Sequence, residues 1–157
     1  MTLSTHTRRQ LSYAEGYLAL GMKAEAAKAL AEIEKVEQEA VPVLKLRLAL
    51  EMERGKWMRA SVAGSKLAEL EPDVAEHWIQ WAYAVRRYIG IDEARAILVR
   101  GLGLHPTVAV FHFNLACYEA QLGHLDDARL FLDTACGLDP VFVELAKTDA
   151  DLAPLRA

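Results

Sequence analysis

Residues 75–108 have the sequence AEHWIQWAYAVRRYIGIDEARAILVRGLGLHPTV, and features of this stretch recur along the chain. Its central alanine, Ala94, has counterparts 34 residues away in both directions. The same step of 34 residues separates Pro72, Pro106 and Pro140, so two residue types keep one register. Such a period indicates a repeat protein, whose units bury their apolar faces against their neighbours. The full alanine series is Ala26, Ala60, Ala94 and Ala128.

The register divides the chain into four units and a closing segment. Within each unit, apolar residues recur every three or four positions, which predicts pairs of amphipathic helices and no strands. The whole sequence, residues 1–157, is expected to form a single domain. The units are residues 7–40, 41–74, 75–108 and 109–142, and the closing segment is 143–157. Their helices are expected near residues 8–21, 24–38, 42–54, 57–70, 74–88, 92–103, 108–122 and 125–137.

The third and fourth units fit a known repeat pattern position by position. The third places Trp78, Trp81, Ala82, Ala94, Leu98 and Pro106 on it, and the fourth places Leu115, Ala116, Gly123, Ala128, Leu132, Ala135 and Pro140. Residues 7–142 therefore resemble a tetratricopeptide-repeat array of bacterial type. The resemblance implies an all-α superhelix of antiparallel helix pairs, used for binding proteins.

Three glycines and one leucine depart from this pattern. In the second unit, Leu48 stands where a small residue is usual and Gly64 where a large one is usual. We interpret this as an exchange of volume between facing helices, which would keep the core filled. In the third unit, Gly101 and Gly103 are expected to loosen or bend the end of the second helix.

Composition and charge limit the kinds of partner. Hydrophobic residues make up 53% of the 157 residues, and the formal net charge is −4. The amino-terminal stretch has no signal-like apolar core, and no run of apolar residues is long enough to cross a membrane, so a cytoplasmic protein is expected. Basic residues form no stripe with interleaved aromatics, which argues against nucleic acid. Cys117 and Cys136 fit a reducing compartment and are not expected to form a disulfide.

The sequence contains no recognisable catalytic motif. Its five histidines lack the spacing of a metal site, and no phosphate-binding glycine loop or nucleophile elbow is present. Neither enzyme activity, a cofactor nor a bound metal is expected. Exposed acidic residues of the fourth unit are interpreted as a solvated outer face, with an acidic docking patch as the alternative. These residues are Asp126, Asp127, Asp133 and Asp139.

The resemblance implies that a concave groove lined by the first helix of each unit binds a segment of a partner protein. An adaptor or scaffold function is therefore expected. The alternatives are a homo-oligomeric structural module, for example a homodimer, and a small chaperone-like protein of a bacterial assembly or secretion pathway. The clamp for a terminal carboxylate found in chaperone-binding relatives is absent, since only Lys45 matches it. The groove residues carried over are Lys45, Ala49, Met52, Ile79, Gln80, Tyr83, Arg86, Arg87, Phe113, Asn114 and Cys117.

The closing segment has two interpretations. Phe142, the last residue of the fourth unit, and Val143 and Leu145 of the closing segment could cover the exposed face of that unit, as repeat arrays require for solubility. Alternatively, the segment could fold into the groove and inhibit binding. We favour the simple cap.

Overall fold

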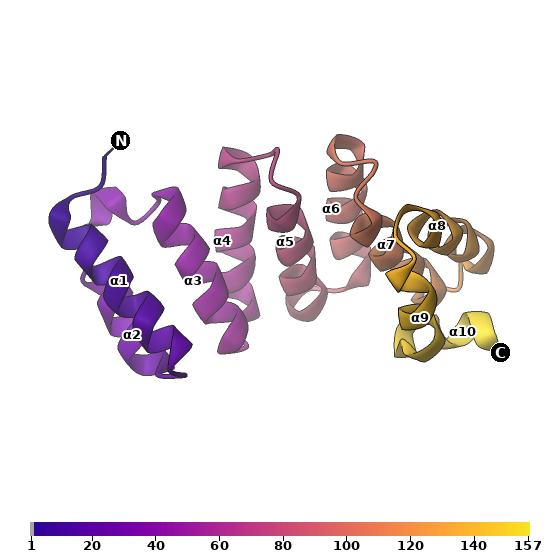
Figure 1. Ribbon diagram of the computed structural model, residues 1–157, viewed down its shortest axis with the longest axis horizontal. Coiled ribbons are helices and arrows are strands. Elements are labelled where there is room, and N and C mark those ends of the chain that lie inside the picture. The colour runs from indigo at the N-terminus through magenta and orange to yellow at the C-terminus, as the bar shows by residue number, and fades with distance from the viewer. Residues whose placement is uncertain (1) are drawn as a thin grey trace.

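A computed structural model describes residues 2–157 and shows four consecutive helix pairs followed by a short closing segment. The pairs stand side by side along the long axis, with the two chain ends at opposite ends of the row (Figure 1). The pairs are α1 (Thr5–Ala19) with α2 (Lys23–Ala31), α3 (Val41–Glu53) with α4 (Trp57–Leu70), α5 (Ala75–Tyr88) with α6 (Ile91–Leu104), and α7 (Ala109–Gln121) with α8 (Leu125–Leu138). The closing segment forms α9 (Val141–Thr148), the 3-10 turn η2 (Ala150–Leu152) and α10 (Ala153–Arg156).

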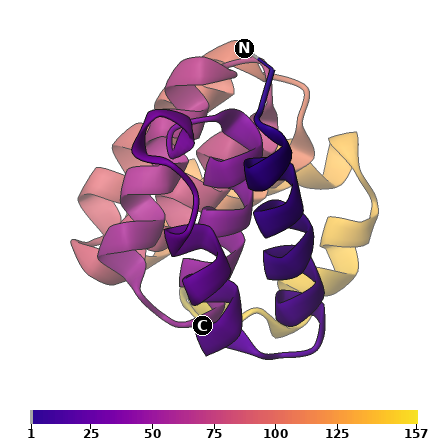
Figure 2. The same cartoon turned by 90° about the vertical axis from the view of Figure 1, so that its left-hand side faces the viewer.

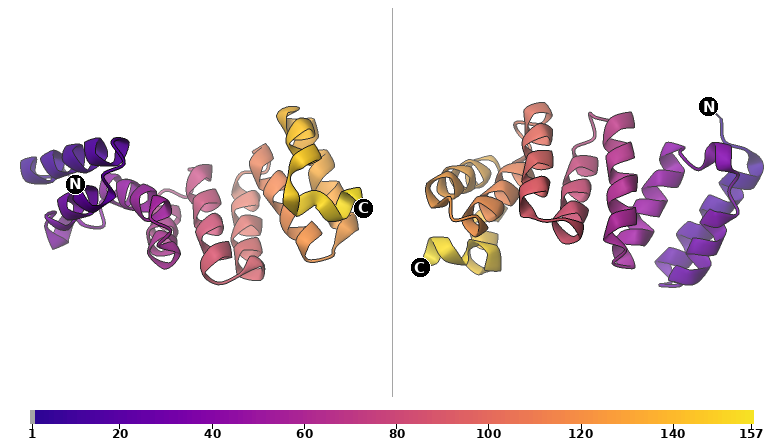
Figure 3. Two further views of the ribbon diagram at one scale, coloured as in Figure 1. Left: turned by 90° about the horizontal axis from the view of Figure 1, so that it is seen from below. Right: turned by 180° about the vertical axis from the view of Figure 1, so that it is seen from behind.

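The row of helix pairs is bowed rather than straight, as the view from below shows (Figure 3). Seen from the amino-terminal end, α1 and α2 stand in front of the remaining helices (Figure 2). We call the exposed side of α1, α3, α5 and α7 the first-helix face, and the exposed side of α2, α4, α6 and α8 the second-helix face.

Turn chemistry explains why three of the pairs reverse in the same way. Gly21, Gly55 and Gly123 have φ angles of 73°, 65° and 85°, a region that glycine enters without the steric cost of a side chain. In the second pair, Lys56 N–H donates to the Glu51 carbonyl at 2.9 Å and Gly55 N–H to the Met52 carbonyl at 3.1 Å. These two bonds close a Schellman motif and satisfy carbonyls that the helix end leaves free.

The first unit differs from the prediction at its second helix. A helix was expected over residues 24–38, but α2 ends at Ala31, and the 3-10 turn η1 (Lys35–Glu37) follows it. The buried Glu37 carboxylate accepts hydrogen bonds from Ser4 N at 2.7 Å and from Thr7 Oγ1 at 2.5 Å, at the start of α1. A carboxylate is stabilised at a helix amino terminus. This tie to α1 fixes the chain after Ala31 in a path that the helix could not follow.

Close contacts with neighbouring helices explain why glycine occupies positions 64 and 101, and they replace the explanations expected from the sequence. A Cβ on Gly64 would lie 3.0 Å from the backbone of Trp81 on α5, so the glycine accommodates α5 rather than Leu48. A Cβ on Gly101 would lie 2.5 Å from the Phe111 ring. Gly101 therefore marks a tight contact with α7, and α6 continues past it to Leu104 without the expected loosening.

Candidate protein-binding surface

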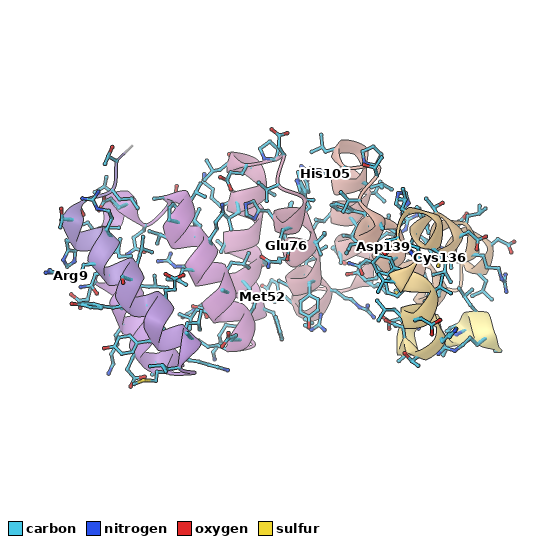
Figure 4. The ribbon with its side chains drawn as sticks, in the orientation of Figure 1. Arg9, Met52, Glu76, His105, Cys136 and Asp139 are labelled. Carbon is cyan, nitrogen blue, oxygen red and sulfur yellow. The ribbon has the colours of Figure 1, made fainter. Side chains whose placement is uncertain are left out.

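The predicted groove residues of the second and third units lie on α3 and α5, in the middle of the row. Figure 4 shows Met52 on α3 and Glu76 on α5 between the two ends of the molecule. Ala49 and Tyr83 are exposed, and the Lys45 ammonium forms an ion pair with Glu71 at 2.9 Å. Among the remaining residues of this set, Arg87 is exposed, and the half-buried ones are Met52, Ile79, Gln80 and Arg86.

An aromatic and cationic cluster stands at the carboxyl end of α5. The Tyr83 ring is 42% exposed and lies 5.9 Å from the Trp57 ring, in an edge-on arrangement. The Arg87 guanidinium lies 3.4 Å from the Tyr83 ring centroid and 5.3 Å from that of Trp57. The cation–π contacts and the edge-on contact between the two rings hold these side chains in place. Trp57 was missed because it belongs to a second helix, which the repeat pattern places outside the groove.

The closing segment covers the α7 part of the predicted groove. Phe142 of α9 stacks on Phe113 with ring centroids 4.7 Å apart. The Arg86 guanidinium donates two hydrogen bonds to the Asp151 carboxylate, at 2.5 and 2.9 Å. Phe113 and Cys117 are consequently buried, and Asn114 is half-buried. The segment both packs on α7 and α8 and occupies this end of the first-helix face.

Burial under this segment makes Cys117 a poor nucleophile and a poor metal ligand. Desolvation raises the pKa of the Cys117 thiol to about 12, and the neighbouring Asp149 and Asp151 carboxylates add to the rise. The thiol sulfur and one oxygen of each carboxylate lie within 4.8 Å of one another, but Arg86 already binds both Asp151 oxygens. Hydrogen bonding to Asp151 also raises the pKa of the Arg86 guanidinium. Both cysteines are free.

Buried carboxylates at two equivalent positions were not predicted. Glu51 on α3 and Glu119 on α7 both occupy the eleventh position of their units, where the repeat pattern has tyrosine. Glu119 is fully buried and is bonded by Arg95 Nε and, at 2.6 Å, by His124 Nδ1. Glu51 is also buried, yet its Oε2 has no hydrogen-bond partner. The sequence did carry a signal for these buried carboxylates, because each glutamate occupies a repeat position where an aromatic residue is usual.

A hollow of about 1000 Å³ opens on the second-helix face around α4. Residues of α3, α4, α5 and α6 line it, and none of the eleven predicted groove residues does. Its wall is largely apolar, with Glu51 as a buried charge within it. The apolar members include Leu44, Val62, Trp81, Val85 and Ile97.

The arrangement of helix pairs matches that of solved repeat structures. A crystal structure of MamA, a non-catalytic tetratricopeptide-repeat protein, superposes with a TM-score of 0.79 at 19% identity, over 94% of this chain and 79% of that one. The chain adopts the tetratricopeptide-repeat fold. A MamA double mutant gives a TM-score of 0.78 at 11% identity, over 88% of this chain and 78% of the other. The repeat region of an O-GlcNAc transferase mutant from Thermobaculum terrenum gives 0.64 at 18% identity, over 86% of this chain and 27% of the enzyme.

Comparison with curated sequences and with family models gave no match for this tetratricopeptide-repeat chain. Among residues 2–157, no helix combines the length and the apolar composition that crossing a lipid bilayer requires.

Proposed function

We propose that this tetratricopeptide-repeat chain is a non-catalytic adaptor that binds a segment of a partner protein along the first-helix face of its second and third units. The ordered cluster of Tyr83, Trp57 and Arg87 supports this proposal most strongly, because exposed aromatic and arginine side chains commonly dominate binding energy at interfaces. Gln80 on the same helix would bond the backbone of the bound segment. The first-helix face is uncovered between α1 and the closing segment, and a partner would bind to this uncovered part.

Site-specific photo-crosslinking in the native cell tests this proposal. A photoreactive phenylalanine analogue replaces Tyr83 in one variant and Leu130 in a control, and Leu130 is 67% exposed on α8. We expect a discrete crosslinked product from the Tyr83 position and none from the Leu130 position. The mass of the product separates the alternatives, since a product of twice the chain mass would indicate a homodimer.

A capture experiment then measures the contribution of the cluster. Tyr83→Ala should weaken capture of the crosslinked partner by more than tenfold, because anchors of this kind commonly contribute about 2 kcal/mol or more. Exchanging Asp126 and Asp127 for lysine on α8 should leave capture within a few-fold at physiological salt. Equal crosslinking from α8 and α5, or full capture by folded Tyr83→Ala, would refute the proposal.

A further inference from the structure

Glu51 lines the wall of the hollow on the second-helix face, and its charge is incompletely matched. Its side chain is 8% exposed. One carboxylate oxygen lies 3.5 Å from Arg54 Nη1 and 3.9 Å from Arg59 Nη1, at the outer limit of ion pairing. The other oxygen, Oε2, has no hydrogen-bond donor. A buried charged oxygen without a donor is costly, so this position favours an incoming donor.

The equivalent position in the fourth unit shows what donor the site accepts. Glu119 lies two repeat periods after Glu51, and Arg95, from the preceding helix α6, donates to its carboxylate. The residue of the first unit in the same register as Arg95 is Ala27 on α2, which has no donor. The preceding helix therefore supplies an arginine to Glu119 but not to Glu51. Arg54 and Arg59 lie near Glu51 Oε1 only, so Oε2 is left without a donor.

The size of the hollow and the number of helices that line it suit a helix as the occupant. Its volume of about 1000 Å³ is at the upper end of the range of about 300–1,000 Å³ for small-molecule pockets. Its lining includes Met58, Val62 and Ser65 of α4, which follow one another at helical spacing, and residues of α5 and α6. An elongated apolar groove between helices is the usual seat of an amphipathic helix.

We propose that this hollow is a second docking site, for a partner helix that carries one arginine in its apolar face. The apolar side chains of the partner would cover Val62, Trp81 and Val85. Its arginine would donate to Glu51 Oε2, as Arg95 donates to Glu119. The site lies on the opposite face from the Tyr83 cluster, so the chain would bind two segments at once.

Synthetic helices of about 18 residues, long enough to be partly helical alone, provide the probe. One has leucine and alanine along one face with a single arginine at its centre, and its partner has citrulline there, which keeps the shape and removes the charge. Binding is measured by fluorescence anisotropy. We expect the arginine peptide to bind tenfold or more tighter than the citrulline peptide, because citrulline keeps N–H donors but loses the positive charge that pairs with the Glu51 carboxylate.

Variants of the protein locate the site. Glu51→Gln should remove the preference for arginine, and Val62→Lys should abolish binding, while Leu130→Lys should not. Val62 and Leu130 are both 67% exposed, so the two lysine variants are matched. Tyr83→Ala should leave peptide binding unchanged, which separates this site from the first-helix face. Thermal melts of each variant accompany the titrations.

The proposal is overturned by equal affinity of wild type for the two peptides, by loss of binding in Tyr83→Ala, or by unchanged binding in Val62→Lys. The first does not depend on any variant folding. Absence of binding by either peptide would also overturn it. None of these results bears on crosslinking from the Tyr83 position, so the two sites stand or fall separately.

Discussion

Replacing Phe142 by alanine should release the closing segment from α7 and expose the Cys117 thiol. Phe142 is 7% exposed and stacks on Phe113, so its ring is a main apolar anchor of the segment. Truncating a buried phenylalanine costs about 3–5 kcal/mol, and the low end applies at a chain end that can relax. Since each 1.4 kcal/mol is a factor of ten, about 3 kcal/mol raises the undocked fraction by about a hundredfold.

The reactivity of Cys117 reports this undocking directly. With a pKa of about 12, the buried thiol is almost entirely protonated at pH 8, and reaction with a thiol reagent must wait for opening. The labelling rate is measured in a Cys136→Ser background, so that only Cys117 reacts. We expect labelling to be faster by about a hundredfold in Phe142→Ala. Val143→Ala, which changes an exposed neighbour, should label at the original rate.

Two results would refute this reasoning. A rate of labelling unchanged in Phe142→Ala, alongside a lower unfolding midpoint, would show that the segment does not cover the thiol. Equal acceleration in Phe142→Ala and Val143→Ala would show that any change in α9 acts through general loosening. Faster labelling in Phe142→Ala alone would also provide a way to test whether the first-helix face extends onto α7 once the segment is released.

Three further perturbations test the packing and the charges. Ala128→Leu should destabilise the fold by about 1–3 kcal/mol in denaturant titrations, because Ala128 is fully buried and a larger side chain forces the helices apart; an unchanged midpoint would contradict this. Gly64→Ala should lower the melting temperature, because the added methyl group would lie against the α5 backbone. Gly103→Ala should raise it, because a methyl group there meets nothing within 4 Å and alanine has a higher helix propensity than glycine. Hydrogen bonds from Thr7 and Ser4 lower the pKa of the Glu37 carboxyl below 4.5. The stability that Glu37 contributes is therefore fully present above pH 4.5 and is lost as the pH falls through the lowered pKa. Glu37→Gln should make the melting temperature less dependent on pH on the acid side, and a profile parallel to that of the wild type would contradict the assignment.

The helix pairs could be predicted from the sequence because a repeat makes local and global constraints agree. Ala60, Ala94 and Ala128 are all fully buried, which confirms that small residues stand where paired helices approach closely. The α4, α6 and α8 helices end two residues before Pro72, Pro106 and Pro140, since proline cannot continue a helix with full hydrogen bonding. The spacing of apolar residues and the turn residues determine the helices within each unit, so these helices can be predicted one unit at a time.

The residues exposed on the first-helix and second-helix faces depend on contacts between segments that are distant in the sequence. Nothing local indicates that Asp151 would reach Arg86 or that Phe142 would cover Phe113, because each pair is brought together by the path of the closing segment. The early end of α2 likewise follows from bonds between Glu37 and the start of α1.

The sequence by itself determined the fold class, the register and the positions that pack helix against helix, because these follow from periodicity within each unit. Only the tertiary structure decided which of the surfaces are open. Glu51 and Glu119 occupy the same register, yet Arg95 on the preceding helix donates to Glu119, whereas Oε2 of Glu51 has no donor. Whether a buried charge is satisfied is set by the residue that lies across from it in space, which no single unit of the sequence specifies.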